Sequence, residues 1–127
     1  MKLNIDIKFD NNGRIVPFMN GREITMIDSP FVVFLTTAGM CSAVFVKAFI
    51  EQRGLSLDGL VITQVMDYDQ RTNHVSEILI DLKLPAGFPE KYTSAIKKVV
   101  NQCPVKQHLL YPPTFEVVTN YDKVAVS

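Results

Sequence analysis

Two cysteines, Cys41 and Cys103, are the side chains of this chain best suited to chemistry. Cys41 lies in an uncharged, largely apolar run, residues 30–43, and Cys103 is followed by Pro104 and Val105 far along the chain. A thiolate attacks electrophiles, and a second thiol close to it can then form a disulfide. An apolar helix with one thiol, together with a distant Cys-Pro-Val, suggests a dithiol site that folding assembles.

Each cysteine also has a purely structural interpretation. Free cysteine is among the most buried residue types, so Cys41 and Cys103 could serve packing alone. In a helix that begins near Pro30, Cys41 is about three turns from the N-terminus, too far for the helix dipole to lower its pKa. Its thiolate would need a nearby cation. A metal site of Cys41, Cys103 and His108 lacks closely spaced ligand pairs, so we expect no metal and no cofactor.

The elements that position these residues predict one α+β domain over residues 1–127. Residues 3–9 alternate apolar and polar side chains, which is typical of a strand with one wet face. Turn signals at residues 11–13 and 20–21 separate two further short strands, 14–19 and 22–27. The chain therefore begins with a β-meander.

A long central helix follows the meander. Ser29 and Pro30 are typical of a helix start, and Gly54 of a helix end, so we expect a helix through Arg53. Its apolar residues surround the axis, which predicts burial on nearly all sides. A chain of this size has little material to bury such a helix, so we infer a homodimer.

Two features of this helix bear on its surroundings. Gly39 and Ala43, four positions apart, would allow another backbone to approach closely. The uncharged run 29–46 is at the short limit for a membrane span and contains polar residues, so a buried helix is favoured over a membrane helix.

The second half of the chain predicts a strand pair and then helices. The strands are expected at residues 60–68 and 75–82, and a second helix at 89–102. A short helix is expected at 103–110, followed by a closing strand at 115–119.

Composition excludes several classes of protein. Thirteen basic and thirteen acidic residues cancel, so no charge pattern for nucleic acid or an anionic membrane is visible. The first residues lack the apolar run of a secretory signal, and two cysteines are too few for a secreted disulfide scaffold. We therefore expect a cytoplasmic protein.

The chain resembles the OsmC/Ohr superfamily, the osmotically inducible and organic hydroperoxide resistance proteins. The resemblance rests on the order of the elements and on short motifs and their spacing. These are Ser29-Pro30, the eleven-residue spacing from Pro30 to Cys41, the motif at residues 39–43, and Cys103-Pro104-Val105. The resemblance implies an intertwined homodimer that brings the two cysteines together. By this resemblance Cys41 would be the peroxidatic thiol and Cys103 the resolving thiol.

The chain departs from the family pattern at one position that bears on activity. Active peroxidases of the family carry a glutamate directly after the proline, where this chain has Phe31, and the next residue is Val32. The family's partner arginine comes from the amino-terminal strands, where Arg22 is the preferred match and Arg14 the second. The usual network of arginine and glutamate is therefore incomplete.

Two hypotheses for function follow. In the first, the chain is a thiol peroxidase that reduces organic hydroperoxides with an external dithiol reductant, in a pocket lined by Phe31, Phe34 and Phe45. In the second, it is a non-catalytic member of the family that binds a small apolar ligand or senses redox state. Both cysteines favour the first hypothesis, whereas Phe31 in place of glutamate favours the second.

Overall fold

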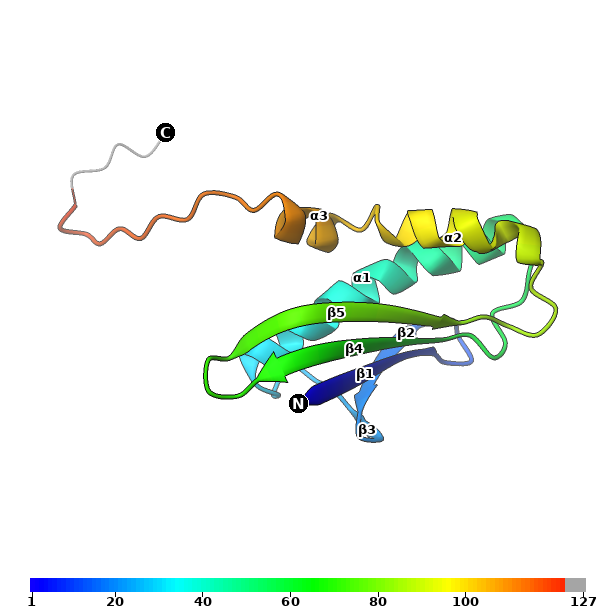
Figure 1. Cartoon of the computed structure of the whole chain (residues 1–127), viewed down its shortest axis with the longest axis horizontal. Coiled ribbons are helices and arrows are strands. Elements are labelled where there is room, and N and C mark those ends of the chain that lie inside the picture. The colour runs from blue at the N-terminus through cyan, green and yellow to red at the C-terminus, as the bar shows by residue number, and fades with distance from the viewer. Residues whose placement is uncertain (123–127) are drawn as a thin grey trace.

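The structure, a computed structural model, describes residues 1–122 as a five-stranded antiparallel sheet with helices packed on one face (Figure 1). The strand order is β3-β2-β1-β4-β5. The elements in chain order are β1 (Lys2–Phe9), β2 (Ile15–Met19), β3 (Arg22–Glu23), α1 (Pro30–Gln52), β4 (Val61–Asp69), β5 (His74–Lys83), η1 (Glu90–Tyr92), α2 (Thr93–Val100) and α3 (Pro104–Leu110).

The predicted β-meander is confirmed, with a shorter third strand. Asn20 and Gly21 have φ angles of 53° and 76°, as the tight β2–β3 hairpin requires. β3 ends after two residues because the chain then turns, and the Asp28 carboxylate accepts the backbone N–H of Thr25 at 2.8 Å. Residues 24–27, predicted as part of that strand, instead lead into the central helix.

The central helix, α1, has the predicted ends. The Ser29 hydroxyl accepts the backbone N–H of Val32 at 3.3 Å, and Pro30 takes the first helical position, where no N–H is needed. At the other end Gly54 has a φ of 66°, and its N–H donates to the Glu51 carbonyl at 3.0 Å. These two caps fix where α1 begins and ends.

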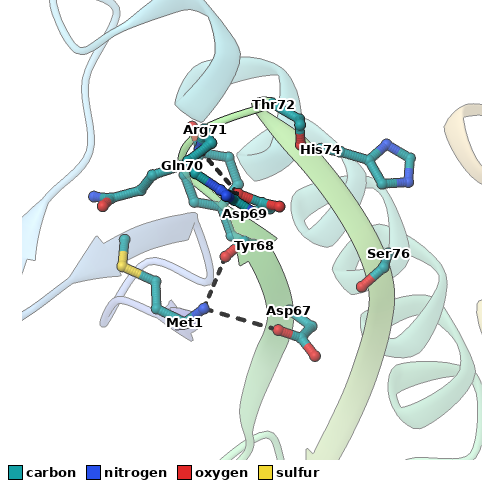
Figure 2. A pocket seen from close by; sticks show the side chains of 9 residues that line it. All are labelled: Met1, Asp67, Tyr68, Asp69, Gln70, Arg71, Thr72, His74 and Ser76. Atoms are coloured by element: carbon teal, nitrogen blue, oxygen red, sulfur yellow. Dashed lines mark hydrogen bonds and ion pairs between the residues drawn. The ribbon is translucent and has the colours of Figure 1, made fainter.

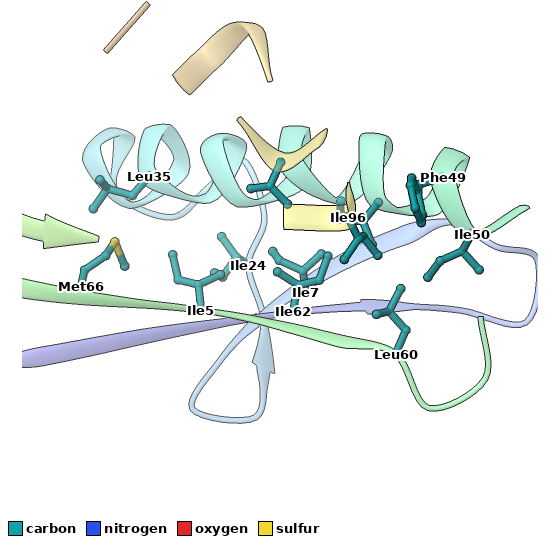
Figure 3. Packing of buried hydrophobic residues seen from close by; sticks show 13 residues of the cluster. Ile5, Ile7, Ile24, Leu35, Phe49, Ile50, Leu60, Ile62, Met66 and Ile96 are labelled. Atoms are coloured by element: carbon teal, nitrogen blue, oxygen red, sulfur yellow. The ribbon is translucent and has the colours of Figure 1, made fainter. Parts of the chain in front are cut away.

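The core lies between α1 and the sheet (Figure 3). Ile5 and Ile7 of β1 and Ile62 of β4 are fully buried beneath the helix. A Cβ on Gly39 would lie 3.2 Å from Gln64 Oε1 and 3.4 Å from Ile7 Cδ1. Gly39 therefore packs α1 against the sheet of its own chain, and the suggestion that it accommodates a second backbone is wrong.

The second and third helices follow the strand pair, as predicted. The first turn of the predicted helix at 89–102 is the 3-10 helix η1, and α2 then buries Ile96 and Val100. Cys103 precedes α3 as its N-cap residue, and Pro104 takes the first helical position. α3 contacts α1, so the segment that carries Cys103 is held beside the central helix.

One face of α1 is not covered by the described residues. Phe34 and Val44 are 46% and 53% exposed, so burial on nearly all sides is not reached within the single chain. α1 is also the one helix of residues 1–122 that is long and apolar enough to cross a bilayer, and half of its most apolar window is buried. Its packing along the sheet is that of a core helix.

The predicted closing strand at 115–119 is wrong for the single chain. These residues pair with no strand among the described residues, and the segment runs away from the body of the molecule (Figure 1). Phe115 and Val117 are 92% and 78% exposed. A strand exists only where a second strand satisfies its backbone groups, and Pro112 and Pro113 direct this segment away from the sheet.

Candidate functional site

The structure brings Cys41 and Cys103 near each other, and both are free thiols. Cys41 lies on the side of α1 next to α3 and is half-buried, while Cys103 is fully buried. The Cys103 thiol donates a weak hydrogen bond to the Ala38 carbonyl of α1, with 4.0 Å between sulfur and oxygen. Folding therefore assembles a dithiol pair from α1 and the start of α3.

Several groups around Cys41 act on its ionisation. Burial raises the pKa of the Cys41 thiol, and the neighbouring Cys103 side chain raises it further. The neighbouring backbone N–H of Val105 lowers this pKa in part. The net pKa is above the ordinary value of a cysteine, so Cys41 is mainly a neutral thiol at pH 7.

The structure places Arg22 in an ion pair. Its Nη2 lies 2.6 Å from Asp28 Oδ1, and this pairing lowers the pKa of the Asp28 carboxyl. Arg14, the second choice, donates from Nε to Asp10 Oδ2 at 3.0 Å. Within residues 1–122, neither arginine contributes to the shift at Cys41.

The three predicted pocket phenylalanines, Phe31, Phe34 and Phe45, all lie on α1. Phe31 stacks with Phe34, with 6.5 Å between ring centroids, and lines a cavity of about 510 Å³ at the start of α1. Phe34 is 46% exposed and Phe45 is half-buried further along the helix. The cavity beside the cysteine-bearing segments has other walls.

That cavity, of about 300 Å³, lies between α1, β4, β5 and α3. Ala38 and Ser42, which flank Cys41 in the helix, form one wall, and Leu109 and Leu110 of α3 form another. Gln64 of β4 also lines it and is fully buried. Sequence reasoning missed Gln64, although a polar residue between the inward-facing Ile62 and Met66 was a usable signal.

A third cavity, of about 530 Å³, surrounds the β4–β5 turn (Figure 2). At this cavity the Met1 ammonium donates to the Tyr68 carbonyl at 2.8 Å and lies 3.9 Å from Asp67 Oδ1. Arg71 forms an ion pair with Asp69. Dashed lines in Figure 2 mark these contacts. The cavity is lined by neither cysteine.

Among residues 1–122 no group of three histidine, cysteine or acidic side chains could hold a metal ion, and His108 Nδ1 lies 2.7 Å from the Pro104 carbonyl.

Comparison with known proteins identifies the family to which this chain belongs. The family model described as OsmC-like protein matches residues 28–118, which include both cysteines and every element from α1 to α3. The chain belongs to the OsmC-like protein family.

A solved structure shows the same OsmC-like fold over almost the whole chain. It is an OsmC-like hydroperoxide resistance protein from Jannaschia sp. CCS1, with a TM-score of 0.62 and 14% sequence identity, and the alignment covers 95% of this chain and 96% of that one. No curated protein sequence matches this chain. The OsmC-like fold inferred from the cysteine phrases and the order of elements is therefore confirmed.

Proposed function

We propose that this OsmC-like protein reduces organic hydroperoxides through Cys41 and Cys103. The observation that carries the proposal is the proximity of two free thiols from distant parts of the chain. Their difference in burial supports the assignment of roles. The half-buried Cys41 can be reached by a peroxide, whereas the fully buried Cys103 is suited to react only with its neighbour.

The proposed reaction has three steps. The Cys41 thiolate attacks one peroxide oxygen, the O–O bond breaks, and the leaving alkoxide takes a proton to become an alcohol. The sulfenic acid on Cys41 then condenses with the Cys103 thiol, which forms a disulfide and releases water. An external dithiol reduces this disulfide by thiol exchange and becomes a disulfide itself.

Thiolate formation is the demanding part of this mechanism. The Val105 N–H stabilises the Cys41 thiolate, but burial outweighs it and the net pKa is raised. We propose that Arg22, from either copy in a dimer, supplies the missing positive charge when it exchanges Asp28 for the thiolate. In the resting protein, Arg22 would then be paired with Asp28 and would leave it only when the thiolate forms.

A homodimer is part of the proposal. The uncovered face of α1 includes Phe34 and Val44, and the segment after α3 exposes Phe115 and Val117. Apolar surface of this extent favours association with another chain. A second copy that covers α1 would also enclose Cys41.

The test is peroxide consumption with dithiothreitol as the reductant. Wild-type protein should consume cumene hydroperoxide catalytically, Cys41→Ser should lose this activity, and Cys103→Ser should lose most of its turnover. Full activity in Cys41→Ser would overturn the proposal. A wild-type protein without turnover would favour the non-catalytic alternative, which Phe31 in place of the family's glutamate also favours.

A further inference from the structure

The turn that joins α2 to α3 carries Cys103, and it must hold this residue against α1 for the dithiol pair to exist. The Cys103 sulfur lies 4.0 Å from the Ala38 carbonyl oxygen, about one helical turn before Cys41. Cys103 is also fully buried. The separation of the two thiols therefore depends on how firmly this turn is fixed.

The backbone fixes the turn only in part. The Cys103 N–H donates to the Val100 carbonyl at 3.4 Å, which is longer than the usual N–H···O bond. Pro104 has no N–H to donate. The Gln107 N–H donates to the Cys103 carbonyl at 3.0 Å, but this bond belongs to the first turn of α3. Among residues 1–122, no backbone hydrogen bond crosses directly from α2 to α3.

Two side chains of α3 close the turn instead. Gln107 Nε2 donates to the Asn101 backbone carbonyl at 2.7 Å, and the Lys106 ammonium donates to the Asn101 side-chain oxygen. Asn101 is the C-cap residue of α2, where a helix leaves carbonyl groups without a backbone donor. Both hydrogen bonds span Cys103 in the sequence and tie α3 to the end of α2.

The first turn of α3 also acts on Cys41. Val105 lies there between Pro104 and Lys106, and its backbone N–H lowers the pKa of the Cys41 thiol in part. A displacement of this turn would therefore move Cys103 and, at the same time, the one N–H that favours the Cys41 thiolate.

We propose that Asn101, Lys106 and Gln107 are positioning residues for the dithiol site, because their hydrogen bonds hold Cys103 within reach of Cys41. They act through Cys103 and not on a substrate. This inference rests on the proposed function, since it concerns the disulfide step of that reaction. Groups held in the right geometry react as though each were present at high concentration, so loss of these bonds should disfavour the disulfide.

The experiment equilibrates the full-length protein with mixtures of reduced and oxidised glutathione and measures the Cys41–Cys103 disulfide by intact mass after acid quenching. The two protein thiols give two electrons and two protons to oxidised glutathione, which becomes two molecules of glutathione. Gln107→Ala removes the donor and keeps α3, since alanine has the highest helix propensity. We expect the equilibrium constant for the disulfide to fall about three- to tenfold, as for one lost hydrogen bond.

Two variants separate positioning from a general effect on the fold. Gln107→Arg restores a long side chain with N–H donors and should bring the equilibrium constant back to within about twofold of wild type. Gln102→Ala changes an exposed glutamine of the same turn, which donates its backbone N–H to the Val99 carbonyl, and should leave the constant unchanged.

A hydrogen bond that only stabilised the fold would act equally on the reduced and oxidised forms and would not move this equilibrium. As a second readout, the pH profile of Cys41 alkylation should shift to higher pH in Gln107→Ala, because the Val105 N–H is less well placed.

The outcomes distinguish this inference from the proposed function. A wild-type equilibrium constant in Gln107→Ala, or an equal loss in Gln102→Ala, overturns the inference and leaves the peroxidase in place. A disulfide that forms in glutathione and weakens in Gln107→Ala, in a protein without peroxide turnover, supports the inference and excludes the peroxidase. If wild type forms no Cys41–Cys103 disulfide at any glutathione ratio, both are overturned.

Discussion

At the scale of single residues, the chemistry of this protein depends on the charge state of Cys41. Burial and the neighbouring Cys103 side chain raise the pKa of its thiol more than the backbone N–H of Val105 lowers it. The resemblance to the family implies an arginine and a glutamate beside this thiol, and this chain has Phe31 at the glutamate position. Cys41 is therefore mainly a neutral thiol in the resting protein and reacts through its small thiolate fraction.

The raised pKa of Cys41 predicts a steep pH dependence. Below its pKa the thiolate fraction, and with it the rate of alkylation of Cys41 by iodoacetamide, should rise about tenfold per pH unit between pH 6 and 8. Peptide mapping after short reaction times measures this rate at each pH. A rate that is constant over this range would mean a lowered pKa and would contradict the structure.

The Arg22–Asp28 pair predicts opposite effects of its two partners. Asp28→Asn removes the competing carboxylate and should increase the rate of Cys41 oxidation by cumene hydroperoxide several-fold. Arg22→Ala should decrease it about tenfold, because the thiolate loses its proposed cation.

Arg14→Ala, which removes an arginine paired with Asp10, serves as the matched control and should leave the oxidation rate unchanged. Stopped-flow oxidation under a single turnover distinguishes these cases. Equal rates in Arg22→Ala and wild type would remove Arg22 from the mechanism.

Part of the candidate site could be predicted from the sequence. The phrases around Cys41 and Cys103 indicated a pair that folding brings together, because a thiol site needs few residues and each phrase is distinctive. The cavity walls could not be predicted, because they depend on how α3 packs beside α1. Gln64 was hidden for the same reason, since only the packing shows that its oxygen has no partner.

At the scale of elements, α1 organises the molecule. Its length and caps could be predicted because Ser29, Pro30 and Gly54 act locally, through hydrogen bonds and φ angles that need no tertiary contact. The strand at 115–119 could not be judged in this way. Alternating apolar residues indicate a strand only if a partner strand is present, and none of the described residues provides one.

The N-cap of α1 gives a prediction for stability. Ser29→Ala removes the acceptor for the Val32 N–H and should lower the free energy of unfolding by about 1 kcal/mol. Urea denaturation at fixed protein concentration measures the change. Thr72→Ala, in the exposed β4–β5 turn, is the control and should stay within about 0.5 kcal/mol of wild type. Equal midpoints for Ser29→Ala and wild type would contradict the assigned cap.

At the scale of the whole molecule, the single chain leaves two apolar surfaces uncovered. One is the face of α1 with Phe34 and Val44, and the other is the extended segment with Phe115 and Val117. The face of α1 is uncovered because the helix is apolar around its whole axis, whereas the one sheet of the described residues covers only one side of it. Both surfaces are explained together if a second copy covers α1 and receives the extended segment.

This predicts a dimer that a single charge on α1 disrupts. Wild-type protein should elute with the mass of two chains in size-exclusion chromatography with light scattering. Val44→Lys places a charge on the uncovered face and should shift the population toward monomer at micromolar concentration. Asn11→Lys, in the exposed β1–β2 turn, adds the same charge elsewhere and should remain dimeric. A monomeric wild type would exclude this arrangement.

The most direct test of the account is intact-mass spectrometry of the reduced protein after one equivalent of cumene hydroperoxide. We predict a rapid loss of two hydrogens in wild type as Cys41 and Cys103 form a disulfide, no change in Cys41→Ser, and a gain of oxygen in Cys103→Ser. If wild type keeps its mass and both thiols still titrate after unfolding, the dithiol peroxidase is excluded.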